Sequence, residues 1–127
     1  MDNKSEKRKK YYLENRLINF SLLIIEIVEL LPDNRVGNHI AGQLLRSGTS
    51  PAFNYGEAQS AESRNDFIHK IKICLKELRE SRIALKIIIK KPLLKPNDKI
   101  EKALNDCDEL ISIFVKSVAT AEKNKRG

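Results

Sequence analysis

Four stretches of this sequence repeat apolar residues at alternating steps of three and four. Such steps place side chains on one face of an α-helix, so this period constrains the fold more than any other feature. We expect the first helix over about residues 12–31, with a buried face formed by Leu13, Leu17, Phe20, Ile24, Val28 and Leu31. A second apolar line, Ile18, Leu22 and Ile25, lies about 100° around this helix and indicates a second partner.

The second stretch, about residues 34–61, contains a proline in its interior. Pro32 ends the preceding helix, and we expect Asp33 to cap the second one with its side-chain oxygen. Pro51 costs a helix interior about 3 kcal/mol, because it removes a hydrogen bond and clashes with the previous turn. Either the helix kinks there or two shorter helices meet, and the continuous spacing favours a kink near Pro51.

Capping signals mark the third and fourth helices. Ser63 and Asp66 nearly form a capping box before a core face that we expect to comprise Phe67, Ile71, Cys74, Leu75, Leu78, Leu85 and Ile89. Pro92 ends this helix, and Asn97 caps a fourth that runs to about Thr120. Its expected core positions are Ile100, Leu104, Cys107 or Asp108, Ile111, Phe114 or Val115, and Val118. Four amphipathic segments with short joins predict an all-α protein, an antiparallel up-down-up-down four-helix bundle.

Length and charge limit the organisation of the chain. The 127 residues suffice for one domain, and the net charge of +7 is concentrated in three places. We expect a flexible basic N-terminal arm at 1–11, the bundle domain at 12–120 and a basic C-terminal tail at 121–127. The third basic element is the third helix.

A cytoplasmic protein that does not enter a membrane is the expectation from the remaining composition. The most apolar run, 17–31, contains Asn19, Glu26 and Glu29, so it is too short and too charged to span a bilayer. Cys74 and Cys107 show no CxxC spacing, and buried reduced thiols are the simplest interpretation.

A polar line runs along the second helix where a seam is usually apolar. Its members are Gln43, Arg46, Ser47, Ser50, Asn54 and Glu57. One interpretation is a buried hydrogen-bond network that fixes the register between helices, with Glu57 and Arg46 closing it. Alternatives are a groove for a ligand or a partner, and plain exposure to solvent.

Basic residues form a stripe along the third helix. Lys72, Lys76, Arg79, Lys86 and Lys90 fall close to one line, which only Ile83 interrupts. A solvated face is one interpretation and contact with phosphates is the other, since repeated subunits would extend the stripe into a continuous basic surface. No recognition-helix motif or aromatic stacking platform is present, so we expect any nucleic-acid binding to depend strongly on salt and weakly on sequence.

Other side chains of the third helix suggest contacts between subunits. Ile73, Ile83, Ala84 and Ile87 lie away from its core face and, with the second apolar line of the first helix, suggest a subunit interface. Arg82 lies beside the core face, and we expect it to pair with Glu57 or Glu80.

Catalytic signals are almost absent. The only histidines are His39 and His69, and the spacing of Asp66 and His69 suits a metal-binding bundle only with a second copy, which the chain lacks. Neither a glycine-rich phosphate loop nor a GxSxG turn occurs. We therefore expect no metal, no cofactor and no enzymatic activity.

Three runs carry a resemblance to a known family. They are GQLLRSGTSPAFNYGEA at 42–58, SAESRNDFIHK at 60–70 and KELRES at 76–81. Together they resemble the signature of four-helix-bundle proteins encoded in 23S rRNA intervening sequences, over about residues 12–118. An aromatic residue commonly follows the third run in that family, whereas Ala84 and Leu85 occupy this region here.

The resemblance implies a homopentamer of bundles without known catalysis. Relatives of the family include accessory variability proteins of diversity-generating retroelements, which are basic pentamers that bind nucleic acid and a reverse transcriptase. It therefore implies RNA or DNA and a reverse transcriptase as partners, and it favours phosphate contact by the basic stripe. A protein-interaction scaffold without nucleic-acid binding is the alternative.

Overall fold

The protein is built from four long helices. The computed structural model describes the backbone of residues 3–126 and the side chains of residues 8 and 10–125. The helices are α1 (Asn3–Leu30), α2 (Arg35–Gln59), α3 (Arg64–Lys90) and α4 (Asp98–Arg126), and no strand occurs within the described backbone. The prediction of an all-α chain with four helices is confirmed.

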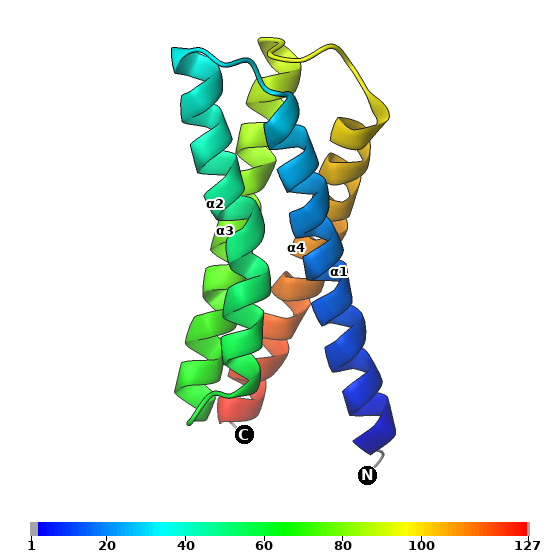
Figure 1. The fold of residues 1–127 in the computed structure, drawn as a ribbon. Coiled ribbons are helices and arrows are strands. Elements are labelled where there is room, and N and C mark those ends of the chain that lie inside the picture. The colour runs from blue at the N-terminus through cyan, green and yellow to red at the C-terminus, as the bar shows by residue number, and fades with distance from the viewer. Residues whose placement is uncertain (1–2, 127) are drawn as a thin grey trace.

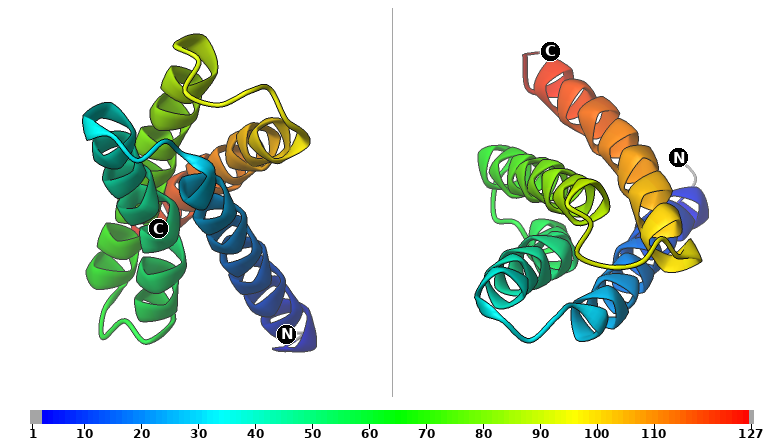
Figure 2. Two further views of the ribbon diagram at one scale, coloured as in Figure 1. Left: turned by 45° about the horizontal axis from the view of Figure 1, so that its top comes forward. Right: turned by 90° about the horizontal axis from the view of Figure 1, so that it is seen from above.

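Each helix packs against two others. The contacting pairs are α1 with α2, α2 with α3, α3 with α4, and α4 with α1. In Figure 1 the chain rises along α1, descends along α2, rises along α3 and descends along α4. Seen from above, the four helices surround a common centre, and the N-terminal turns of α1 diverge from the rest (Figure 2). The bundle therefore has four sides, and each of them is formed by two helices that contact each other.

Two helices extend beyond their expected ends. We predicted a start near Tyr12 for α1 and an end near Thr120 for α4, whereas they begin at Asn3 and end at Arg126. These predictions are wrong because the terminal turns are polar and carry no apolar period. The parts of the basic arm and the basic tail that the structure describes are continuous with α1 and α4.

Side-chain caps fix the starts of the other helices. Ser63 Oγ accepts a hydrogen bond from the Asp66 N–H at 3.0 Å, and Asn97 Oδ1 accepts one from the Ile100 N–H at 3.0 Å, as predicted. The cap of α2 is Asn34, whose side chain accepts from the Gly37 N–H at 2.8 Å. The assignment of this cap to Asp33 is therefore wrong by one residue.

Pro51 lies inside α2, which passes through it as a single helix. The alternative of two shorter helices is therefore wrong. The Pro51 carbonyl accepts a hydrogen bond from the Cys74 thiol at 3.4 Å, which ties this part of α2 to α3. A kink at Pro51 stays a prediction.

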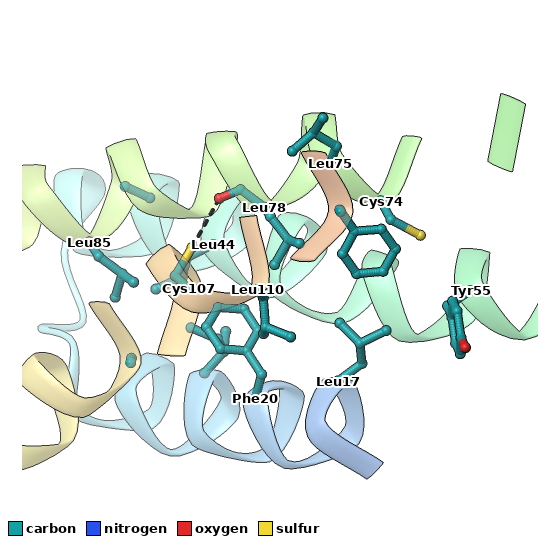
Figure 3. Close-up of a cluster of buried hydrophobic side chains, with 14 of the residues drawn as sticks. Leu17, Phe20, Leu44, Tyr55, Cys74, Leu75, Leu78, Leu85, Cys107 and Leu110 are labelled. Atoms are coloured by element: carbon teal, nitrogen blue, oxygen red, sulfur yellow. Dashed lines mark hydrogen bonds between the residues drawn. The ribbon is translucent and has the colours of Figure 1, made fainter. Parts of the chain in front are cut away.

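A single core fills the centre of the bundle. Leu17, Phe20, Leu78 and Leu110 meet there, and the Cys107 thiol donates to the Leu78 carbonyl at 3.1 Å (Figure 3). Most of the expected apolar positions are buried or half-buried. One prediction is wrong: Ile89 is 44% exposed, whereas Ile88 is buried. Ala84, which we placed away from the core face of α3, is buried as well, so that prediction is also wrong.

Candidate nucleic-acid interface and the polar line of α2

The basic stripe lies on the outer face of α3. Lys86 is half-buried, and the other four members, Lys72, Lys76, Arg79 and Lys90, are exposed. Lys72 Nζ pairs with Glu122 Oε1 of α4 at 2.6 Å. The other four cations form no ion pair within the described part of the chain, so their charges face solvent.

The dimensions of the stripe suit a polyanion. Eighteen residues separate Lys72 from Lys90, which corresponds to about 27 Å along a helix. Each strand of duplex DNA carries one phosphate per about 3.4 Å of helix axis, so a line of this length passes several of them. The cations follow each other at intervals of one or two helical turns. All of them belong to α3, so their backbone positions are fixed by a single helix.

A buried pair of hydroxyls joins the polar line of α2 to α3. Ser81 Oγ donates to Ser47 Oγ at 2.9 Å, and both residues are almost completely removed from solvent, at 0% and 1% exposure. Ser47 Oγ donates in turn to the Leu44 carbonyl at 3.5 Å. This chain of hydrogen bonds fixes the height of α2 relative to α3, because a shift of either helix would leave a buried hydroxyl without a partner.

Arg46 binds two carboxylates of α3. Its guanidinium donates to Glu77 Oε2 at 2.7 Å and to Glu80 Oε2 at 2.9 Å, and also to Gln43 Oε1 at 3.2 Å. Burial raises the pKa of Glu77, which is only 6% exposed. The hydrogen bond from Arg46 is the main cause of the lowered pKa of Glu80. One arginine thus stabilises a carboxylate that the core side of α3 would otherwise leave unpaired.

The rest of the polar line bonds locally or to α3. Asn54 Nδ2 donates to Ser50 Oγ at 2.8 Å and to the Ser50 carbonyl at 3.0 Å. Glu57 Oε1 pairs with Lys70 Nζ at 3.4 Å. The expected closure between Glu57 and Arg46 is therefore wrong. Arg46, Ser47 and Glu57 do contact α3, but of the polar line only Ser47 is buried, and Gln43, Arg46 and Glu57 are exposed.

The pairing of Arg82 also differs from the prediction. Its Nε donates to Asp108 Oδ1 of α4 at 2.6 Å, rather than to Glu57 or Glu80. Sequence reasoning missed this pair because the spacing within α3 does not reveal which residue of α4 lies at the same height.

Of two hollows in the bundle, the first was not anticipated from the sequence and the second lies on the polar line of α2, where a groove was one of the alternatives. One, of about 410 Å³, lies where α1 diverges and is lined by aromatic side chains from four helices, Tyr12, Tyr55, Phe67 and Phe114. The other, of about 370 Å³, lies between α2 and α3 and contains Arg46 and Glu80. The first could have been found only by combining aromatic positions from all four helices.

The described residues include neither a metal-ligand cluster nor an exposed thiol. His, Cys, Asp and Glu side chains do not gather there in groups of three that could hold a metal ion. Burial raises the pKa of the Cys74 and Cys107 thiols to about 12, so neither is poised as a nucleophile. In this part of the chain, none of the helices combines the length and the apolar character that crossing a membrane requires.

Comparison with known proteins identifies the family. The model of the 23S rRNA-intervening sequence protein family matches residues 9–116. A solved structure from Bacteroides thetaiotaomicron, described as a protein with unknown function from the S23 ribosomal protein family, shares 29% identity with a TM-score of 0.78. The match covers 87% of this chain and 98% of that one, and no curated protein matches. The chain therefore belongs to the 23S rRNA-intervening sequence protein family.

Proposed function

We propose that this protein is a non-catalytic, self-assembling scaffold that binds the backbone of RNA or DNA through the basic stripe of α3. The observation that carries the proposal is the outward position of Lys76, Arg79, Lys86 and Lys90, none of which has an ion pair in the described residues. Cations without an ion pair remain available to phosphates, and counterions are released when they bind. The family name supports an association with an rRNA intervening sequence.

A self-assembled form would strengthen such binding. A homopentamer, which the resemblance implies, would repeat the stripe around a ring and multiply weak phosphate contacts. A reverse transcriptase is the protein partner that the resemblance implies for such an accessory scaffold.

Salt-dependent binding is the direct test. We expect RNA and duplex DNA to bind at low salt, and affinity to fall linearly with the logarithm of salt concentration. Charge reversal by Lys76→Glu with Arg79→Glu should weaken binding at least tenfold and reduce the salt slope. Fluorescence anisotropy with labelled duplexes of several sequences measures both quantities.

A matched control changes the same net charge elsewhere. Lys95→Glu with Lys116→Glu alters exposed cations of the α3–α4 loop and of α4, outside the stripe. We expect this variant to bind much more tightly than the stripe variant. Equal losses in both variants, or no binding by the natural protein at low salt, would exclude the stripe as the binding surface.

A protein-interaction scaffold without nucleic-acid binding is the second candidate function. Exposed apolar side chains on the outer faces of α1, α2 and α3 favour it, including Phe53 at 73% exposure and Ile83 at 57%. Pull-down from nuclease-treated extract distinguishes the two candidate functions. If the chain recovers a protein partner there and binds no RNA or DNA in the titrations, only the second candidate is supported.

A further inference from the structure

Exposed apolar side chains gather where α1 and α2 meet on the outside of the bundle. This apolar face comprises Ile18, Leu22 and Ile25 of α1 with Leu45 and Phe53 of α2, all exposed. Ser21 Oγ donates to the Gly48 carbonyl at 3.3 Å, so the two helices are in close contact beneath it. Soluble monomers rarely expose so many large apolar side chains side by side, which indicates a covered surface.

A second apolar surface lies on the neighbouring side of the bundle. The α2–α3 groove combines the apolar side chains of Ile40, Ile83, Ala84 and Ile87 with polar ones, His39, Gln43, Ser47 and the Arg46–Glu80 ion pair. Its continuation along α3 is bordered by Lys86, Lys90 and Lys91. Within the groove Arg46 is paired with Glu80, and the end of the surface toward Lys90 is apolar with a basic border.

The charges of the two surfaces are complementary. Over residues 18–30, α1 carries only Glu26 and Glu29 as charged residues. Glu26 pairs with Lys99 of α4, whereas Glu29 is exposed and has no ion pair in the described residues. Arg46, the only cation between Leu45 and Phe53, is held by Glu77 and Glu80. The apolar face is thus acidic at its end, opposite in sign to the border of the groove.

The heights of the two surfaces along the bundle agree. Ser21 bonds to Gly48, and Ser47 bonds to Ser81, so residues 21 and 81 lie at nearly the same height. Because α1 and α3 run in the same direction (Figure 1), Ile25 lies between the heights of Ile83 and Ile87. By the same count, Glu29 lies near the height of Lys90. Two copies with parallel axes would place the apolar face of one against the apolar side chains of the other's groove, with Glu29 near Lys90.

We propose that the apolar face of one copy of this chain binds in the α2–α3 groove of a second copy. Glu29 of the first copy then lies opposite Lys90 of the second. This rests on the self-assembly in the proposed function and names its surfaces. The contact is head-to-tail, since each copy offers two different surfaces. Both surfaces share α2 and lie on adjacent sides of the bundle, so successive copies turn relative to one another, as the closure of a ring requires. In the assembly Lys86 and Lys90 border this contact, so phosphate binding falls to Lys76 and Arg79, which with Lys72 remain outside it.

Mixing two variants tests the proposal. Leu22→Lys disables the apolar face and Ile83→Glu disables the groove, and both changes introduce good helix formers at exposed positions, so circular dichroism should show intact helices. Nuclease-treated full-length protein is analysed by native mass spectrometry and sedimentation. We expect the natural protein to form a closed oligomer and each variant alone to be monomeric. Their mixture should give a one-to-one heterodimer, because one intact face still meets one intact groove.

Three results would overturn the proposal. They are a monomeric natural protein, an oligomer that survives either substitution, and a mixture that stays monomeric. If the apolar face paired with itself, Ile83→Glu would still dimerise, and the head-to-tail contact would be wrong. Binding of RNA by the monomeric variants is measured separately, so a failure of the contact and a failure of the nucleic-acid proposal are distinguishable.

Discussion

Ser47 and Ser81 show how single residues set the register of this bundle. Each hydroxyl is removed from water, and each has its hydrogen bond satisfied through the other helix or its own turn. With an apolar pair at this position, α2 could shift along α3 at little cost in free energy. A buried hydroxyl that loses its partner costs about 1–3 kcal/mol. The two serines therefore contribute to specificity more than to net stability.

A double-mutant cycle measures this contribution. Ser47→Ala should lower the free energy of unfolding by about 1–2 kcal/mol, because it leaves the buried Ser81 hydroxyl unpaired. Ser81→Ala should lower it by about 1 kcal/mol, because Ser47 loses one hydrogen bond but still donates to the Leu44 carbonyl. The double variant should lose clearly less than the sum, because no unpaired hydroxyl remains. Urea unfolding measures all three, with Thr49→Ala, whose hydroxyl bonds within its own helix, as a control within about 0.5 kcal/mol. Strict additivity of the two serine changes would contradict the coupling.

We expect the buried thiols to make stability fall at alkaline pH. Burial raises the pKa of Cys74 and Cys107 to about 12, from an ordinary value near 9.0. Below pH 8 both states keep these protons, but above about pH 9 only the unfolded chain releases them, so the free energy of unfolding falls by up to about 1.4 kcal/mol per pH unit for each thiol. Cys74→Ala with Cys107→Ala should show a shallower decline between pH 9 and 10.5 in urea titrations. Equal slopes for both proteins would refute this origin.

At the scale of the helix, Gly48 permits the close approach of α1 and α2. A Cβ at this position would lie 2.6 Å from Ile24 Cγ2, whereas at Gly42 it would meet nothing within 4 Å. Both glycines are inside α2, so alanine gains helix propensity of about 1 kcal/mol at either position. The difference between the two substitutions therefore isolates the packing between helices.

We expect opposite signs for these substitutions. Gly42→Ala should raise the free energy of unfolding by up to about 1 kcal/mol. Gly48→Ala should lower it by about 1–2 kcal/mol, because the displaced Ile24 side chain costs more than propensity returns. Thermal or urea unfolding at low protein concentration measures both. A Gly48→Ala variant as stable as Gly42→Ala would show that α1 moves aside at no cost.

The sequence predicted the elements better than their relative positions. Apolar period and capping residues located four helices, and Ser63 and Asn97 begin α3 and α4 as expected. The polar ends of α1 and α4 have no such period, so their extent was missed. The outward position of the basic stripe followed from the helix period alone. The partners of Arg46 and Arg82 did not, because they depend on the height of one helix against the next.

For the whole molecule, the distribution of charge separates two roles of α3. Lys76 and Arg79 lie on the free part of the stripe in the proposed assembly, whereas Lys90 borders the contact between copies. Substitutions at the two ends of one helix should therefore affect different measurements. Loss of the cations Lys76 and Arg79 should weaken nucleic-acid binding, and loss of Lys90 should weaken assembly.

A charge exchange tests the second role. Glu29→Lys or Lys90→Glu alone places like charges across the contact and should weaken assembly about two- to fivefold at each contact, the range of an exposed ion pair. Both changes in one chain restore opposite charges between copies, so the double variant should assemble nearly as the natural protein does. Sedimentation over a range of concentrations and salt measures this, and high salt should reduce the differences. A double variant weaker than either single one would place Glu29 and Lys90 apart in the assembly.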